Sequence, residues 1–240
     1  MLNITPSWAT ITGKTAGRLS GMLTIKDVFK NKEIKQLLEA TALQMTTLGY
    51  TEHSFRHCRL VSNKCGEILT MLDFPERVVE LGRIAGYLHD IGNAVNRNNH
   101  AQSGAILAYD FLRRQGMPCD ESIPIMMAIA NHDEEVGIPV NPIAAALILS
   151  DKADVHRSRV TNRDLQSFDI HDRVNYAATY SAIAVDARNK VATLNLTIDT
   201  DISAVMDYFE IFLVRMKMCR NAAHFLDLQF RLLINGNQLL

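Results

Sequence analysis

Cysteine is scarce in this sequence, and its few residues follow no recognisable pattern. The four cysteines, Cys58, Cys65, Cys119 and Cys219, are scattered through 240 residues and include no CxxC pair. In a chain of this length, scattered cysteines are typical of reduced thiols in a cytosolic protein. We therefore expect a cytoplasmic protein without a thiolate metal site.

An excess of charge and long apolar runs are lacking too. Lys and Arg number 25 and Asp and Glu number 26, so no bulk field favours a nucleic acid polymer or an anionic membrane as partner. No stretch approaches the ~18 apolar residues of a membrane span, and the first residues lack the pattern of a signal peptide. We expect a soluble protein that binds neither nucleic acid polymers nor membranes.

Apolar residues at helical spacing are abundant. They make up 48% of the chain, which is enough for a real core in a large domain. Residues 1–25 show no clear period and are expected to form an irregular N-terminal arm. Residues 26–172 are expected to form a helical bundle, because their apolar residues recur with the period of a helix. The expected helices cover residues 30–49, 52–71, 76–90, 99–115, 121–135 and 142–158.

The period changes in residues 173–240. In YSAIAVDARNKVATLNLTID, apolar residues alternate on both sides of a charged turn, which predicts a hairpin. Helical spacing returns over residues 202–223, with Ile202, Val205, Met206, Phe209, Phe212, Leu213 and Met216 on one stripe. LDLQFRLLING alternates again, so the segment is predicted to be a small ββαβ unit. The predicted fold is mainly α, a bundle followed by this α+β unit, whose exposed sheet edge offers a contact for a homodimer.

Histidine and aspartate gather at or near the predicted helix ends of the bundle. The residues are His53, His89, Asp90, His100, His132 and Asp151. Imidazole and carboxylate ligands together suit Fe, Mn, Ni, Co or Zn, and carboxylates also accept Mg. A first ion could be held by His53, His89, Asp90 and Asp151. His100 and His132 supply a second ion, which Asp90 can bridge to the first because a carboxylate has two oxygens.

These residues form a known pattern. The motifs EHS (52–54), HDIG (89–92) and SDKAD (150–154), together with His100 and His132, resemble the HD superfamily of metal-dependent phosphohydrolases. The resemblance covers about residues 30–160 and implies an HD-domain helical bundle. It also implies a dinuclear site, with His53, His89, Asp90 and Asp151 as ligands and with His100 and His132 completing it.

Within the superfamily, the sequence is most similar to the symmetrical bis(5′-nucleosyl)-tetraphosphatase branch. The similarity lies in an ADK-like stretch followed by an arginine, here Asp151, Lys152 and Arg157. The family's usual lysine after HDIG is Asn93 in this chain. NHDEEVGIP (131–139) lacks the GYP signature of cyclic di-GMP phosphodiesterases, which makes that substrate improbable. The ββαβ unit lies outside the resemblance.

Several of the proposed ligands keep a second interpretation. His57 lies one helical turn after His53 and is its rival as a ligand, although the Glu-His-Ser context favours His53. His100 could be a polar residue in the first turn of a helix. His132 could complement a helix dipole when it is protonated.

Charged residues near these ligands are candidates for substrate binding. Lys152 and Arg157 could neutralise a substrate phosphate, although a solvated helix face is the alternative for both. Asp154 is a candidate catalytic residue that either orients a ligating imidazole or stabilises the attack, with capping and solvent exposure as alternatives. Weaker candidates for lining the pocket are Arg56, Asn93, Arg97 and Glu135. His156, His171 and His224 fall outside the pattern.

The sequence therefore predicts a metal-dependent phosphohydrolase that cleaves a phosphate ester or anhydride of a nucleotide or another small phosphorylated metabolite. Metal-activated hydroxide would attack phosphorus, with Asp90 holding the ions and Lys152 stabilising the developing charge. Two alternatives stay open. One is an HD-type mixed-valent di-iron oxygenase, because myo-inositol oxygenase resembles the same arrangement of histidines and aspartates. The other is a non-catalytic ligand-binding regulator.

Overall fold

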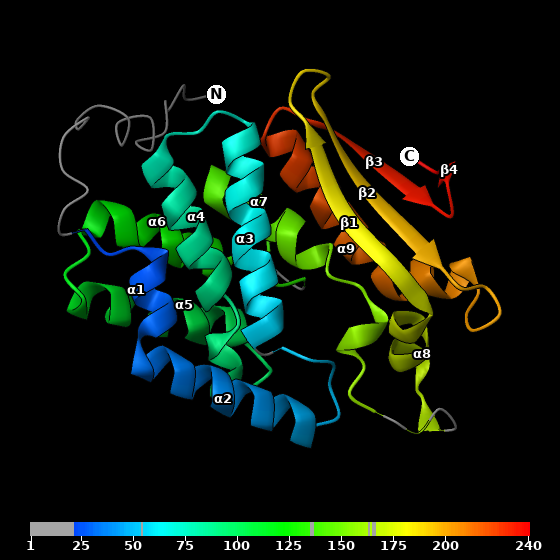
Figure 1. Ribbon diagram of the computed structural model, residues 1–240, viewed down its shortest axis with the longest axis horizontal. Helices are drawn as coiled ribbons and strands as arrows, with labels where there is room; N and C mark the ends of the chain where they lie inside the picture. The colour runs from blue at the N-terminus through cyan, green and yellow to red at the C-terminus, as the bar shows by residue number, and fades with distance from the viewer. Residues whose placement is uncertain (1–21, 54, 135–136, 163, 165–166) are drawn as a thin grey trace.

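A helical bundle leads into a four-stranded sheet in the computed structural model (Figure 1). The structure describes residues 22–53, 55–134, 137–162, 164 and 167–240. The predicted N-terminal arm therefore lies mostly outside the described residues. None of the helices in the described part of the chain is both long and apolar enough to span a membrane.

The bundle is built from short helices that begin at well-defined caps. Asn31 caps α2 through its side-chain oxygen, and Asn141 does the same for α7, which begins with Pro142. The elements are α1 (Ile25–Lys30), α2 (Lys32–Thr47), α3 (Phe55–Met71), α4 (Glu76–Leu88), the 3₁₀ turn η2 (Ile91–Ala94), α5 (His100–Arg114), α6 (Cys119–Ala130) and α7 (Pro142–Lys152).

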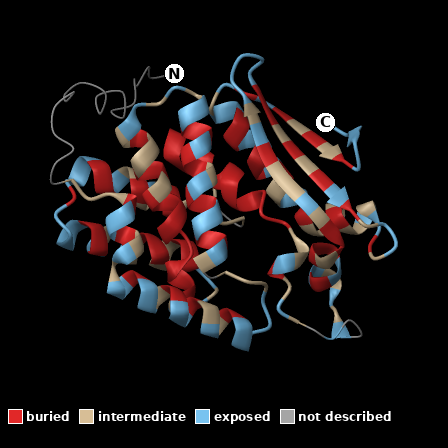
Figure 2. Cartoon of the chain, viewed as in Figure 1, coloured by how far each residue is buried: buried red, intermediate tan, exposed pale blue. Residues whose placement is uncertain are grey.

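Helix α7 forms the centre of the bundle. Every residue from Pro142 to Lys152 is buried, whereas the surrounding helices are buried only on the faces that they turn inward (Figure 2). The apolar run PIAAALIL explains this position, because a helix that is apolar all round is stable only inside a protein. Asp151 lies in its last turn and is therefore presented from the rigid core.

A glycine allows α3 and α4 to approach closely. A Cβ atom added at Gly86 would lie 2.8 Å from the Cα and 2.9 Å from the backbone nitrogen of Ser62. No side chain fits at that distance, so only glycine permits this helix contact. The close approach brings the first turn of α3 beside the end of α4, where His57 and His89 lie.

The C-terminal segment, residues 170–240, forms a mixed sheet that packs on α9. The hairpin of β1 (Ala178–Asp186) and β2 (Val191–Ile198) is antiparallel, with Ile183 opposite Leu194. The chain then passes through α9 (Val205–Phe225) to β3 (Gln229–Ile234), which runs parallel to β2. The short β4 (Asn237–Gln238) completes the order β1-β2-β3-β4. Helix α9 contacts both α7 and the strands β2 and β3, so it joins the sheet to the bundle (Figure 1).

The predicted fold class is confirmed, and the differences from the sequence prediction are local. The helix predicted over 121–135 ends at Ala130, and the one predicted over 142–158 ends at Lys152. On α9 the predicted stripe is partly wrong, because Met206 and Leu213 are exposed. The buried face instead carries Tyr208, Phe212, Met216, Cys219, Ala222 and Ala223.

One helix was not expected from the sequence. Helix α8 (Ile170–Ala177) runs directly into β1, so the boundary expected between residues 172 and 173 falls inside α8. Its polar sequence IHDRVNYA masks the helical period. The 3₁₀ turn η3 (Arg157–Arg159) precedes it. Strand β1 forms one edge of the sheet, and a homodimer through the C-terminal unit stays a prediction.

Candidate metal centre

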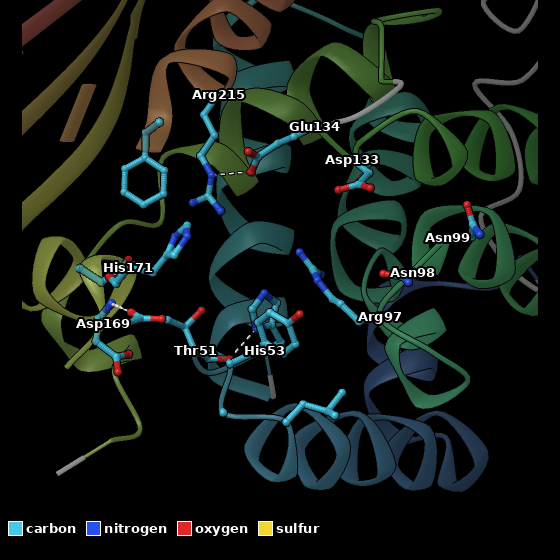
Figure 3. A pocket seen from close by; sticks show the side chains of 16 residues that line it. Thr51, His53, Arg97, Asn98, Asn99, Asp133, Glu134, Asp169, His171 and Arg215 are labelled. Carbon is cyan, nitrogen blue, oxygen red and sulfur yellow. Dashed lines mark hydrogen bonds and ion pairs between the residues drawn. The ribbon is translucent and has the colours of Figure 1, made fainter. Parts of the chain in front are cut away.

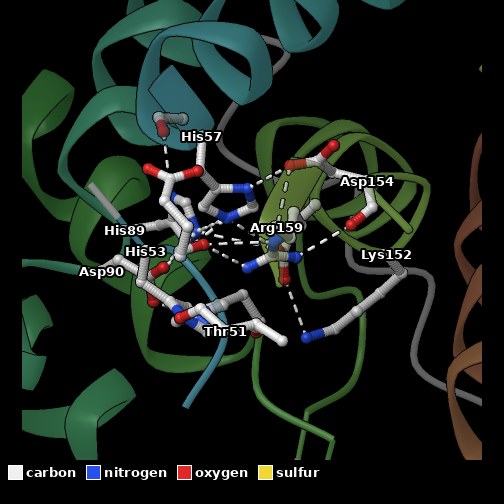
Figure 4. A network of polar contacts seen from close by, with 12 residues as sticks. Thr51, His53, His57, His89, Asp90, Lys152, Asp154 and Arg159 are labelled. Carbon is white, nitrogen blue, oxygen red and sulfur yellow. Dashed lines mark hydrogen bonds and ion pairs between the residues drawn. The ribbon is translucent and has the colours of Figure 1, made fainter. Parts of the chain in front are cut away.

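Four histidines and two aspartates converge inside the bundle. Figure 4 shows three of them, His57, His89 and Asp90, close together. Each of the six side chains belongs to a residue that is at most 8% exposed. They come from helix ends and from the turns between them: His57 in α3, His89 and Asp90 after α4, His100 at the start of α5, His132 after α6 and Asp151 in α7.

A first group of ligand atoms surrounds the Nε2 atom of His57. This atom lies 3.2 Å from the Nε2 atom of His89 and 3.2 Å from Oδ1 of Asp151. Oδ2 of Asp90 lies 3.5 Å from the Nε2 atom of His57 and 3.3 Å from that of His89. These atoms are close enough together to share one ion.

A second group lies on the other side of Asp90. The Nε2 atoms of His100 and His132 are 3.2 Å apart, and they lie 3.7 and 3.9 Å from Oδ1 of Asp90. Asp90 therefore turns one oxygen toward each group. The side-chain amide of Asn93 donates a hydrogen bond of 2.9 Å to Oδ1 of Asp90 and holds this orientation.

The tautomer of each of the four histidines follows from the contact that its Nδ1 atom makes. In His89, His100 and His132, Nδ1 lies 2.9, 3.1 and 2.6 Å from a backbone carbonyl oxygen, and in His57 it lies 2.7 Å from Oδ2 of Asp154. A carbonyl or carboxylate oxygen can only accept a hydrogen bond, so each Nδ1 carries the proton and donates the bond. When Nε2 carries no proton, each ring presents the lone pair of this atom to the cluster, as a metal ligand must.

An unpartnered oxygen of Asp90 is a second reason, besides the histidine tautomers, why the cluster suits a cation. Oδ2 of Asp90 is buried, and it has no hydrogen-bond partner among the residues that the structure describes. A buried carboxylate oxygen without a partner is costly, and a metal ion is one of the few groups that satisfies it. The cluster could therefore hold divalent metal through six oxygen- and nitrogen-donor residues.

The turn between His89 and His100 depends on Gly92. A Cβ atom at this position would lie 2.0 Å from the carbonyl oxygen of His100 and 2.5 Å from the backbone nitrogen of Gly104. Only glycine lets η2 lie this close to the first turn of α5. Asn99, which precedes α5, has a positive φ of 59°, a conformation that asparagine tolerates. The turn thereby brings His100 back to Asp90.

Charge concentrates on the two carboxylates of the cluster. Burial alone would raise the pKa values of Asp90 and Asp151, but the positive charges of His89 and Lys152 outweigh it, and both pKa values lie well below the usual range. Burial would likewise lower the pKa of His89, but Asp90 and Asp151 outweigh it and raise that pKa to about 10. The site thus favours a positive charge between these carboxylates.

A further set of charged residues supports the cluster. The Nζ atom of Lys152 lies 2.7 Å from Oδ2 of Asp151 and 3.7 Å from Oε1 of Glu134. Arg159 donates to the backbone oxygen of Asp154 at 2.8 Å, and its Nε atom lies 3.7 Å from Oδ2 of the same residue. Asp154 thus lies between His57 and a buried guanidinium group.

A polar cavity of about 550 Å³ adjoins the cluster (Figure 3). Its walls come from the segment before α3, from the turn before α5, and from α8 and α9 of the C-terminal segment. The lining side chains include Tyr50, His53, Arg97, Asp133, Glu134, Asp169, His171, Asn175, Phe212 and Arg215. The space is large enough for a small polar metabolite.

Comparison with known proteins agrees with this geometry. A family model described as the HD domain matches residues 54–172, a segment that contains all six converging residues. The chain contains an HD domain. HD domains bind divalent metals, and the histidines and aspartates described above are the residues that could hold them.

Two individual proteins resemble part of the chain. An uncharacterized protein of Methanocaldococcus jannaschii is 24% identical over 157 residues, which cover 55% of this chain and 60% of that protein. The match thus spans less than two thirds of that relative. The crystal structure of a predicted HD superfamily hydrolase from an uncultured Thermotogales bacterium is 20% identical and covers 56% of this chain and 75% of its own, with a TM-score of 0.43.

At the start of the HD domain, the structure favours His57 over the preceding His53 as a ligand. His53 donates from Nδ1 to the carbonyl oxygen of Thr51 at 2.6 Å, and its ring centre lies 5.7 Å from that of His57. It lines the cavity and belongs to none of the potential ligand groups found among the described residues. The geometry therefore favours His57, the rival that the sequence left open, because its ring points at the other candidate ligands.

The other predicted residues divide between the HD-domain site and its surroundings. Asn93, Arg97, Lys152 and Asp154 lie at the cluster or the cavity, whereas Glu135 lies outside the described residues. Arg157 is not brought to the cluster. Its guanidinium carbon lies 5.2 Å from the ring centre of Tyr176, and its Nη2 atom lies 3.9 Å from Asp199, so it joins the C-terminal segment.

Three charged residues at the HD-domain site were not singled out from the sequence. Arg159 orders Asp154, while Glu134 and Arg215 form an ion pair in the cavity wall. Arg159 lies within two positions of the predicted Arg157, and only the backbone turn of η3 decides which of the two faces inward. No sequence motif near Arg215 links it to the site, since it belongs to a helix of the C-terminal segment.

Proposed function

We propose that this protein is a metal-dependent phosphohydrolase that cleaves a phosphate ester or anhydride of a nucleotide or another small phosphorylated metabolite. One observation carries the proposal. Four histidines donate from Nδ1 to fixed oxygen acceptors, so their Nε2 lone pairs converge on Asp90 and Asp151. An HD domain with this donor set is suited to hold metal for hydrolysis.

The two ligand groups that share Asp90 support a site for two ions. His57, His89 and Asp151 would hold one ion, and His100 and His132 would hold the other. Bound metal of this kind lowers the pKa of water and polarises a phosphoryl oxygen. The donor set suits Fe, Mn, Co, Ni or Zn, and a thiolate contribution from the nearby Cys58 is disfavoured because burial raises the pKa of this thiol well above its usual value.

The chain's own residues would prepare the site for an anionic substrate. Asn93 keeps one oxygen of Asp90 turned to each ligand group. Lys152 lies beside Asp151 and offsets its charge, which reduces the repulsion that a phosphate group would meet. His53 lines the cavity, and burial together with the charge of Arg159 lowers its pKa well below the usual value. It therefore stays neutral and can donate or accept a hydrogen bond.

The test joins metal analysis to a screen of phosphorylated compounds. Protein loaded with Mn²⁺, Fe²⁺, Co²⁺, Ni²⁺ or Zn²⁺ is incubated without oxygen with p-nitrophenyl phosphate and with nucleotides, and released phosphate is measured. We expect about two metal ions per chain and phosphate release that Asp90→Asn abolishes. Oxygen consumption by the iron-loaded protein without phosphate release would instead indicate an oxygenase. Metal binding without either reaction would indicate a regulator.

A further inference from the structure

Arg215 reaches the HD-domain site from outside the HD domain. It lies on α9, beyond residue 172, and its guanidinium group enters the cavity beside the cluster (Figure 3). The guanidinium carbon lies 4.3 Å from the ring centre of Phe212, and the side chain is 22% exposed. The stacked ring leaves the edge of the guanidinium group free to donate hydrogen bonds.

A chain of ionic contacts connects Arg215 to the metal ligands. Its Nε atom donates to Glu134, whose Oε1 lies 3.7 Å from the Nζ atom of Lys152, and Lys152 contacts Asp151 at 2.7 Å. The negative charges of Glu134 and Asp151 raise the pKa of Arg215 although burial would lower it. Arg215 is therefore a fixed positive charge close to the metal side of the cavity.

A second guanidinium group faces the same space. Arg97 precedes α5, and its Nη1 atom lies 3.2 Å from Oδ1 of Asn93 and 3.4 Å from Nε2 of His100. Both contacts are with neutral groups, because burial lowers the pKa of His100 to about 4. In Figure 3, the guanidinium groups of Arg97 and Arg215 both turn toward the middle of the cavity.

We propose that Arg215 and Arg97 together bind the phosphate group of the substrate, so that the C-terminal segment completes the site of the HD domain. The inference rests on the proposed function and names how its substrate is held. Two guanidinium groups on different elements match the planar, multidentate hydrogen bonding that phosphate oxygens accept. Glu134 keeps Arg215 extended into the cavity until a phosphate group arrives.

The remaining walls indicate the rest of the substrate. Asp169, His171 and Asn175 of the α8 region line the cavity away from the cluster, and Tyr50 adds an aromatic ring. Carboxylate, amide and imidazole side chains recognise hydroxyl and amino groups. The cavity therefore suits a phosphorylated compound with a hydroxyl- or amino-bearing group, such as a sugar or a nucleoside. A purely apolar leaving group finds little matching surface.

Calorimetric titration of the Mn²⁺-loaded full chain with inorganic phosphate tests the inference without needing turnover. We expect Arg215→Gln to weaken phosphate binding about 10-fold or more, since hydrogen bonds to charged groups are strong, and Arg97→Gln to act in the same direction. Arg215→Lys should recover only part of the affinity. Lys217→Gln is the matched control, because Lys217 lies exposed on the same helix and should bind phosphate as the wild type does.

The outcomes separate this inference from the proposed function. Unchanged phosphate affinity in Arg215→Gln, at unchanged metal content and thermal midpoint, would overturn it. An equal loss in Lys217→Gln would also overturn it, because the effect would then be bulk charge. A wild-type protein that binds phosphate through Arg215 but hydrolyses none of the screened compounds would refute the phosphohydrolase proposal and leave the binding role of Arg215 standing.

Discussion

The Nδ1 atom of His57 lies 2.7 Å from Oδ2 of Asp154, which holds the His57 ring in the tautomer that turns Nε2 to the cluster. The same carboxylate lies 3.4 Å from Arg56 and 3.7 Å from Arg159, so its charge and position are fixed by two guanidinium groups. Asp154 is thus a positioning residue that acts through His57.

Asp154→Asn should therefore weaken metal binding without removing a ligand. The amide can turn its NH₂ group to Nδ1 and favour the wrong tautomer of His57. We expect about a 10–100-fold loss of Mn²⁺ affinity, measured by titration with a competing chelator. Asp110→Asn, on the exposed face of α5, is the control and should bind Mn²⁺ normally. Equal affinities for both variants would show that Asp154 does not position His57.

The two neighbouring histidines should differ in what they bind. We expect His57→Ala to lose metal, because its Nε2 atom is the one that lies 3.2 Å from both His89 and Asp151. His53→Ala should keep the metal content of the wild type and change KM, since His53 lines the cavity. Metal content per chain is measured by elemental analysis after dialysis. Metal loss in His53→Ala alone would reverse the assignment.

This pair shows where sequence reasoning about the site reached its limit. His89, Asp90, His100, His132 and Asp151 were predicted as ligands because their types and order match a donor pattern that does not depend on fine geometry, and the structure brings these five residues together. Choosing between His53 and His57 requires knowing which ring points inward, and this depends on the contact of α3 with α4. Glu134 and Arg215 form an ion pair although 81 positions separate them in the sequence, and no local pattern predicts such a contact.

The same distinction between local pattern and long-range contact explains which parts of the fold were predictable. Helices and the ββαβ order were predictable because burial imposes periods that are visible in the sequence. The buried face of α9 was partly mistaken, since this helix contacts both α7 and the sheet, and its small residues Cys219, Ala222 and Ala223 are buried while Met206 is exposed. Helix α8 escaped prediction because it is short and polar.

The raised pKa of His89 predicts how stability depends on pH when metal is removed. Its pKa of about 10 in the folded protein exceeds the value of about 6.5 expected for an unfolded chain. Protonated His89 therefore adds stability below pH ~6.5, and this stability is lost as pH rises toward the folded pKa. We expect the midpoint temperature of unfolding of chelator-treated protein to decrease as pH rises from ~6.5 to ~8.5. This range lies below the pH at which the cysteines of the unfolded chain ionise.

Metal should remove this dependence, because a bound ion takes the place of the proton on His89. The midpoint of Mn²⁺-loaded protein should stay level or rise over the same range. His89→Gln should flatten the curve of the chelator-treated protein, whereas His224→Gln, which changes an exposed histidine on α9, should leave it unchanged. A chelator-treated wild type that gains stability over this range would contradict the prediction.

Gly92→Ala tests whether the turn after HDIG sets the spacing of the two ligand groups. The added methyl group would lie 2.0 Å from the carbonyl oxygen of His100, an atom of the backbone that cannot move alone. Relief requires η2 and α5 to separate, which moves Asp90 away from His100. We expect the free energy of unfolding to fall by about 1–3 kcal/mol, measured by urea denaturation, together with weaker Mn²⁺ binding.

Gly66→Ala is the matched control, because the three atoms nearest to its methyl group would all belong to the side chain of Arg83, which can turn away. Gly66 also lies inside α3, where alanine is the better helix former by about 0.5–1 kcal/mol. The control should therefore keep both its stability and its metal content. If Gly92→Ala lost stability but bound Mn²⁺ with full affinity, the close approach of η2 to α5 would support the bundle without setting the distance between Asp90 and His100.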